Sequence, residues 1–225
     1  MKRFLGKCLI FLLILSVIFL PMGIGLDPYN IFHWNNIRNN GVEPNKGYVK
    51  MMNILRNPDK YDSYLFGSSR AGFFDVSKMN DGHYYDMAYS EGTPGEHLQN
   101  LKDMLSRGVK IKNVTMGVDD ISYFVDPDFH KDQLYRKPFP WSGSLTDKAG
   151  FYLSYLDLIT LSQSVEVIMK HKNTDPFYGK RLLETGTENL SIKTDFHYEK
   201  TDATWSDYYY PREEGLDEIR EIVEL

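Results

Sequence analysis

The strongest constraint on how this chain can fold is a run of apolar residues near its N-terminus. Residues Cys8 to Leu20 include a single polar side chain, Ser16, and mostly apolar residues extend the run to Leu26. A helix needs about 20 such residues to cross the hydrocarbon core of a membrane. A helix that is apolar on every face is a poor fit to a small soluble fold. The rest of the chain is therefore expected to form a separate domain.

Basic residues around this run predict its orientation. Lys2, Arg3 and Lys7 precede the apolar segment, and the next basic residue is Arg38. Because basic residues concentrate on the cytoplasmic side of membranes, the N-terminus is expected inside and the larger part of the chain outside. We therefore interpret residues 1–26 as a cytoplasmic tip and signal-anchor helix, which predicts a single-pass protein of the cell membrane with an extracytoplasmic domain.

A cleaved signal peptide stays open as the alternative to an anchor. Residues 21–26 offer only glycines separated by bulky residues, whereas signal peptidase sites favour small residues in an A-x-A-like pattern. The single cysteine, Cys8, lies at the start of the apolar run, whereas a lipid-modified cysteine would follow it. We interpret Cys8 as a small apolar residue facing lipid.

Charge and cysteine content exclude several classes of protein. The chain has 26 basic and 31 acidic residues, and three of the basic ones lie in residues 1–26, so residues 27–225 carry a net charge of −8 (23 − 31). Such a domain is not expected to bind nucleic acid. One cysteine cannot form an internal disulfide or a thiolate zinc site. Five histidines show no metal-ligand spacing: His33, His83, His97, His130 and His171. We expect no metal and no cofactor.

Short apolar segments alternate with helical patterns and predict an α/β fold. Strands are predicted at 61–66, 84–89 and 109–118, and amphipathic helices at 46–57 and 96–105. This alternation is typical of a parallel sheet. It predicts that the carboxyl ends of all three strands meet at one edge of the sheet.

The predicted domain organisation has three parts. Residues 1–26 form the anchor, residues 27–60 form a juxtamembrane stem and first helix, and residues 61–225 form the α/β domain. Within that domain, residues 126–210 have little periodicity and are interpreted as a lid or insertion.

The C-terminal third is helical in pattern at both of its ends. Residues 151–169 predict a long helix with a break near residues 162–164, and residues 212–225 predict an amphipathic helix that ends the chain. In a βαβ fold a helix normally leads into another strand. Either this last helix caps the sheet or the chain is incomplete at its C-terminus.

Three loops follow the three predicted strands. They contain Gly67-Ser68-Ser69-Arg70, Glu91-Gly92-Thr93 and Gly117-Val118-Asp119-Asp120. Ligands of open α/β sheets bind outside the carboxyl ends of the strands, so these loops are expected to share one site. A serine between a strand and a helix lies near backbone amides that can stabilise an oxyanion.

These loops resemble the sequence blocks of the SGNH/GDSL hydrolase superfamily, in particular its membrane-anchored bacterial branch related to D-alanine transfer and alginate acetylation proteins. Residues 64–70 are similar to the first block, which makes Ser69 the candidate nucleophile. Residues 86–92 are similar to the second block and make Gly92 an oxyanion donor. Residues 116–120 are similar to the third block, with Asp119 where the family has an oxyanion asparagine. The resemblance implies a flavodoxin-like three-layer sheet.

The chain departs from this family at two points. An ionised Asp119 cannot donate a hydrogen bond to an oxyanion, so it is either protonated or has another role, such as a helix cap. The family's fourth block, Asp-x-x-His, is absent; its histidine would activate the serine. Asp195 and His197 form a candidate shortened pair. Ser69 and Gly92 could also belong to an ordinary helix cap and turn.

The resemblance implies a serine esterase or O-acyltransferase that acts on a cell-envelope polymer without a cofactor. Its expected partners are a cell-envelope polysaccharide or an acyl donor, and the membrane through residues 8–26. The competing hypothesis is a truncated or degenerate envelope protein that binds or scaffolds without catalysis.

Overall fold

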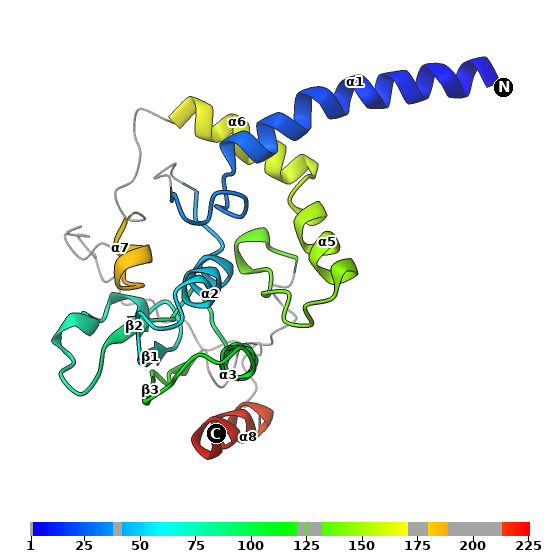
Figure 1. Ribbon diagram of the computed structural model, residues 1–225. Coiled ribbons are helices and arrows are strands. Elements are labelled where there is room, and N and C mark those ends of the chain that lie inside the picture. Colours follow the sequence, from blue (N-terminus) through cyan, green and yellow to red (C-terminus); the bar gives the residue numbers. More distant parts are fainter. Residues whose placement is uncertain (1, 38–41, 121–124, 126–131, 171–179, 189–212) are drawn as a thin grey trace, which may run out of the picture.

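The computed structural model describes residues 2–37, 42–120, 125, 132–170, 180–188 and 213–225. Within these ranges the chain has a mixed α/β fold around a parallel sheet (Figure 1). The strands are β1 (Ser63–Phe66), β2 (Tyr84–Asp86) and β3 (Asn113–Met116), in the order β2-β1-β3. The α/β prediction and the three parallel strands are confirmed.

Each strand is shorter than its sequence pattern predicted. Tyr61 lies before β1 but is buried, and Met87 and Ala88 follow β2 and are also buried. All four residues of β1 are buried because it is the central strand. Burial of the flanking residues explains why their sequence resembles strand.

The two faces of the sheet are covered differently. Tyr64, Phe66 and Tyr85 belong to the main core, together with residues of α2 (Lys46–Arg56) and α3 (Pro94–Ser106). Leu65 and Tyr84 point to the other face, where the described residues include a small cluster built on the 3₁₀ turn η2 (Val76–Lys78). After β1 the chain forms a 3₁₀ turn, η1 (Ala71–Phe73), so the helix expected directly after Ser69 is wrong.

Helix α3 begins directly after Thr93. Thr93 and Glu96 occupy capping-box positions, in which the Thr93 amide donates to the Glu96 carboxylate at 3.2 Å, and Pro94 occupies the first turn, where its missing N–H costs no hydrogen bond. Leu98, Leu101 and Met104 face the core. The C-terminal helix α8 (Glu213–Glu224) packs against α3 and buries Ile222. Both helices confirm the sequence pattern.

The segment before α2 is part of the folded body. Tyr29 and Ile31, which we expected in a juxtamembrane stem, lie in the main core. Asn45 caps α2 by accepting a hydrogen bond from the Tyr48 amide at 2.9 Å. Its amide also donates to the Lys137 carbonyl at 2.8 Å. This one side chain therefore joins the start of the domain to residues of the expected lid.

The long helix predicted at 151–169 is two helices. Helix α5 (Leu145–Ser154) and helix α6 (Leu158–Lys170) are separated at residues 155–157, not near residues 162–164. The Tyr155 hydroxyl donates to the Leu134 carbonyl at 2.7 Å, and Asp157 accepts a hydrogen bond from the Thr160 amide at 2.8 Å. A core-facing tyrosine and a cap therefore set the break. Short helix α7 (Lys180–Glu184) packs on α2.

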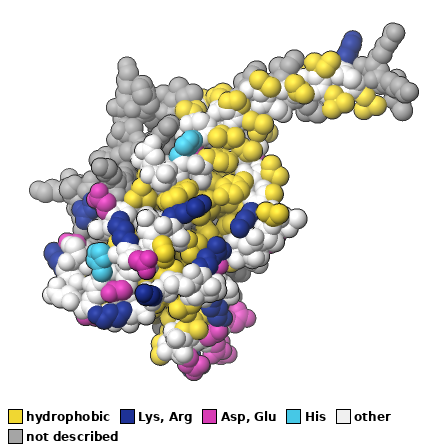
Figure 2. Space-filling model, in the orientation of Figure 1, with side chains coloured by type: hydrophobic (Ala, Val, Ile, Leu, Met, Phe, Trp, Pro, Cys, Tyr) yellow, Lys and Arg dark blue, Asp and Glu magenta, His cyan; other side chains and the backbone are white. Residues whose placement is uncertain are grey.

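Helix α1 (Lys2–Leu26) projects from this body, and the C-terminal end of α1 contacts α6 (Figure 1). Hydrophobic side chains lie exposed along its outer part, among them Phe4 and Leu9 (Figure 2). Across the described ranges, no helix meets the combined length and hydropathy expected of a membrane span. The anchor stays a prediction from the sequence.

Candidate functional site

Backbone hydrogen bonds bring the three predicted loops together at the carboxyl edge of the sheet. The Tyr89 amide donates to the Gly67 carbonyl at 3.3 Å, and the Gly117 amide donates to the Phe66 carbonyl at 2.8 Å. The loop after β1 is therefore bonded to the loop after β2, and the last residue of β1 is bonded to the loop after β3. This is the meeting point expected from parallel strands.

Gly67 makes this close approach possible. Its φ angle is +154°, and a Cβ at this position would lie 2.8 Å from the Ala71 Cβ and 3.1 Å from the Gly117 oxygen. No other residue fits without moving the loop. The first residue of the Gly-Ser-Ser motif is thus required by packing.

The two serines of the motif have different environments. Ser68 is buried, and its hydroxyl donates to the Asp119 carboxylate. Ser69 is half-buried, and its hydroxyl has no hydrogen-bond partner among the described residues. Of the two hydroxyls, that of Ser69 is the one available to a ligand.

Asp119 ties the ends of β1 and β3 together through Ser68. The same Ser68 oxygen accepts a hydrogen bond from the Arg70 amide at 3.3 Å. Arg70 in turn forms a two-pronged ion pair with Asp120 and lies 3.9 Å from Asp119. In this arrangement Asp119 accepts the Ser68 hydrogen bond and orders the serine loop, which differs from the donor role of the asparagine in the SGNH/GDSL block that the sequence resembles.

Gly92 lies directly against the serine loop. A Cβ there would lie 2.7 Å from His97 Nε2 and 2.9 Å from the Gly67 oxygen, so a larger residue would push the loop away. The Gly92 amide donates to the Tyr89 carbonyl at 3.1 Å. It can reach an oxyanion at Ser69 only if this turn opens.

His97, for which the sequence predicted no role in the site, is buried against the serine loop. Its Nε2 lies 3.1 Å from the Gly67 oxygen, and the ring packs between Phe66 and Tyr89. Burial lowers the pKa of His97 to about 3, with a lesser opposing effect from its bond to Gly67. The ring is therefore neutral, and its Nε2–H donates to Gly67.

A neutral donor to a backbone carbonyl cannot also accept the proton of Ser69 through that nitrogen. His97 is a positioning residue for the loop. One signal could have found it: His97, Leu101 and Met104 follow helical spacing, so the histidine lies on the buried face of α3.

Buried charges flank the site on the side of β2. Lys50 and Asp86 are both fully buried, with Lys50 Nζ 3.7 Å from Asp86 Oδ1. Burial is the largest effect on both groups: it raises the pKa of Asp86 to about 7 and lowers the pKa of Lys50. The Lys50 ammonium also donates to the Ala88 carbonyl, immediately after β2.

A second buried pair reaches the serine loop from the other direction. Lys46 Nζ lies 2.5 Å from Glu188 Oε1 and 2.9 Å from Glu43. The Glu188 amide donates to the Gly72 carbonyl at 3.2 Å, which fixes residue 188 beside the turn that follows Ser69. Neither pair was found from the sequence, because its members are far apart along the chain.

Both members of the candidate pair, Asp195 and the predicted base His197, lie outside the described residues. In the ranges that the structure does describe, no cluster of three or more His, Cys, Asp or Glu side chains could hold a metal ion. The described site thus consists of a nucleophile candidate, a positioning histidine and fixed charges.

Comparisons with family models, with curated proteins and with solved structures found no match for this chain. The site is therefore interpreted from its own geometry and from the resemblance of its sequence blocks.

Proposed function

We propose that this protein is a membrane-anchored, extracytoplasmic esterase or O-acyltransferase of SGNH type that acts on a cell-envelope polymer through Ser69. The observation that carries the proposal is the contrast between the two serines: Ser68 is buried and bonded to Asp119, whereas Ser69 is half-buried and its hydroxyl has no partner among the described residues. A nucleophile needs a free, accessible hydroxyl on a loop held in place by its neighbours.

In the proposed reaction, Ser69 Oγ attacks the carbonyl carbon of an acyl ester. Its proton passes to a base, for which His197, oriented by Asp195, is the candidate. The tetrahedral oxyanion is stabilised by the Ser69 amide, joined by the Gly92 amide once the turn that bonds it to the Tyr89 carbonyl opens. Loss of the alcohol leaves an acyl-enzyme, and attack by water or by a polymer hydroxyl releases the serine.

Two observations favour the second candidate, a non-catalytic envelope binding protein. Asp119 places a carboxylate where the family has an uncharged donor, and that carboxylate already accepts the Ser68 hydroxyl. The only histidine beside the serine loop among the described residues is His97, whose Nε2 is committed to Gly67. Both features suit a fold that keeps its loop geometry without activating a serine.

The deciding experiment is reaction of the full chain in detergent with a fluorophosphonate probe, followed by mass spectrometry of the adduct. We expect labelling at Ser69 that is lost in Ser69→Ala. The matched control is Ser77→Ala, because Ser77 is an exposed serine on η2 whose hydroxyl bonds only within its own turn. It should label like the wild type.

A second variant, His197→Gln, tests the base. Labelling that persists in Ser69→Ala would remove Ser69 from the mechanism, whereas no labelling of the folded wild-type chain would favour the binding protein. Labelling of Ser69 that is unaffected by His197→Gln would keep the nucleophile but remove His197 from the mechanism.

A further inference from the structure

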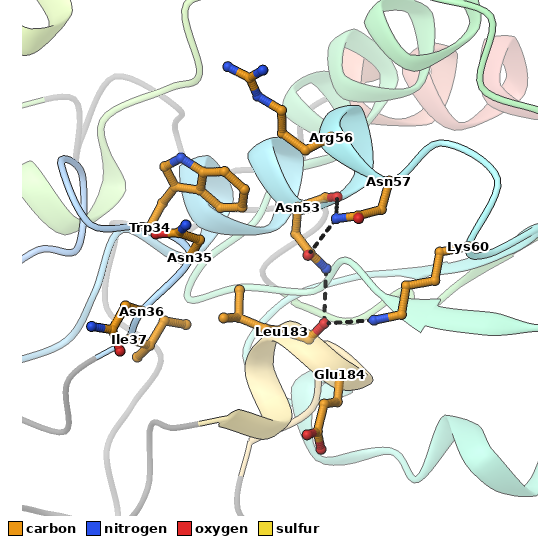
Figure 3. Close-up of a pocket in the computed structure, with 10 residues that line it drawn as sticks. All are labelled: Trp34, Asn35, Asn36, Ile37, Asn53, Arg56, Asn57, Lys60, Leu183 and Glu184. Carbon is orange, nitrogen blue, oxygen red and sulfur yellow. Dashed lines mark hydrogen bonds between the residues drawn. The ribbon is translucent and has the colours of Figure 1, made fainter.

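A cleft lies at the opposite end of β1 from Ser69. It has a volume of about 650 Å³ and is formed by residues 34–37, the last turn of α2 with Asn57 and Lys60 after it, and α7 (Figure 3). Lys60 lines it three residues before β1, whereas Ser69 follows β1. Its volume is within the range of small-molecule sites, about 300–1,000 Å³.

The walls of the cleft combine one large aromatic ring with side-chain amides. Trp34 and Asn35 lie on one side, Asn57 and Lys60 on the other, and Leu183 between them (Figure 3). The Asn53 amide donates to the Leu183 carbonyl at 3.1 Å, and Asn57 donates to Asn53 oxygens. These bonds hold the floor of the cleft in place before any ligand binds.

Several polar groups of the cleft have no partner among the described residues. Asn35 and Asn36 are exposed, and their side-chain amides bond to no other described residue. The guanidinium of Arg56 is exposed and forms no ion pair within the described part of the chain. Lys60, by contrast, donates to the Leu183 carbonyl at 3.5 Å and packs over the Tyr61 ring.

This combination favours one class of ligand. An indole provides a flat apolar surface for the C–H face of a pyranose ring, and amides can both donate to and accept from sugar hydroxyls. A free guanidinium pairs with a carboxylate or phosphate in two-pronged geometry. We propose that the cleft of Trp34, Asn35 and Arg56 is a binding site for a sugar that carries an anionic group.

The site does not depend on the reaction at Ser69, because the two regions share no residue and lie at opposite ends of β1. An acidic glycan held here would be bound by the fold whether or not the serine is reactive. Loss of one activity therefore leaves the other to be tested independently.

The test is calorimetric titration of the full chain in a polyoxyethylene detergent, which contains no sugar headgroup. The probes are a trimer of galacturonic acid, the same trimer as its methyl ester, and galactose 6-phosphate. We expect the acidic trimer to bind at least about tenfold more tightly than its ester. The phosphate sugar distinguishes whether carboxylate or phosphate is the preferred anion, and binding of either supports the proposal.

Two variants and two controls make the test specific. Arg56→Gln should weaken binding of the acidic sugar about tenfold or more and leave the ester unchanged, whereas Trp34→Leu should weaken both. Arg220→Gln removes another exposed arginine, on α8, and Ser69→Ala removes the proposed nucleophile; both should bind like the wild type. Absence of binding by both acidic sugars, equal binding of acid and ester, or an unchanged Arg56→Gln would overturn the proposal.

Discussion

The carboxyl ends of β2 and β3 flank the same serine loop but carry their charges in opposite settings. Beside β2, Lys50 and Asp86 are both fully buried, whereas beyond β3 the Asp120 side chain is 26% exposed and that of its partner Arg70, on the serine loop, is 64% exposed. A buried pair loses its hydration and holds one geometry, while an exposed pair exchanges readily with water and salt. We infer that the β2 side fixes the site and that, on the β3 side, the exposed pair of Arg70 and Asp120 can rearrange around a ligand.

The largest effect is expected from removal of the buried cation, Lys50. Lys50→Met leaves Asp86 buried without its partner and should lower the free energy of unfolding by about 3–5 kcal/mol at pH 8. The pKa of Asp86 in the folded chain is raised to about 7, so ionisation costs stability as the pH rises through that value. The penalty should therefore be smaller at pH 6 than at pH 8, as measured by urea unfolding.

The matched control is the double variant Lys50→Met/Asp86→Asn, which removes both charges. It should recover part of the lost stability at pH 8 and show little difference between the two pH values. A single variant as stable as the wild type at pH 8 would contradict a buried, mutually dependent pair.

The second largest effect is expected at the positioning residue His97, and it is a dependence of the free energy of unfolding on pH. The pKa of His97 is lowered to about 3 in the folded chain, and its ordinary value is about 6.5. Protons therefore bind more readily to the unfolded chain, so the stability contributed by neutral His97 is complete above pH 6.5. It decreases toward pH 3 by up to about 1.4 kcal/mol per pH unit.

His97→Gln removes the titrating ring and keeps an amide that can donate to Gly67. Its free energy of unfolding should change less between pH 6.5 and pH 5 than that of the wild type. His83→Gln is the control, because His83 is exposed and should keep the wild-type dependence. If the free energy of unfolding of His97→Gln changes with pH as steeply as that of the wild type, another buried group is responsible for the dependence.

The fold was predictable where local signals and burial agree. Helix α3 has residues at capping-box positions, a proline in its first turn and a regular apolar face, and its predicted start at Glu96 differs from the observed one by two residues. Strand lengths were overestimated because residues such as Tyr61 and Met87 are buried just outside the ladder. The break between α5 and α6 depends on the contact of Tyr155 with Leu134, which no local pattern reveals.

The candidate site was predictable only as a set of loops. Parallel strands place the residues after β1, β2 and β3 at one edge, and the structure joins those loops through the carbonyls of Phe66 and Gly67. The partners of individual side chains were not predictable, since the contact of Ser68 with Asp119 and that of Lys46 with Glu188 join residues more than 50 positions apart. The cleft beside Trp34 was missed for the same reason, because α7 closes it from residues 183 and 184.

The smallest effect is expected at the exposed pair of Arg70 and Asp120. Surface ion pairs contribute about 0.2–1 kcal/mol, so Arg70→Gln and Asp120→Asn should each change the free energy of unfolding by less than about 1 kcal/mol. A double-mutant cycle measured by urea unfolding at about 0.02 M and 0.5 M salt gives their coupling, which should nearly vanish at the higher salt because the Debye length shortens. A coupling above 2 kcal/mol that resists salt would show that the β3 side is held as firmly as the β2 side, and the division between a fixed and an adjustable half of the site would be wrong.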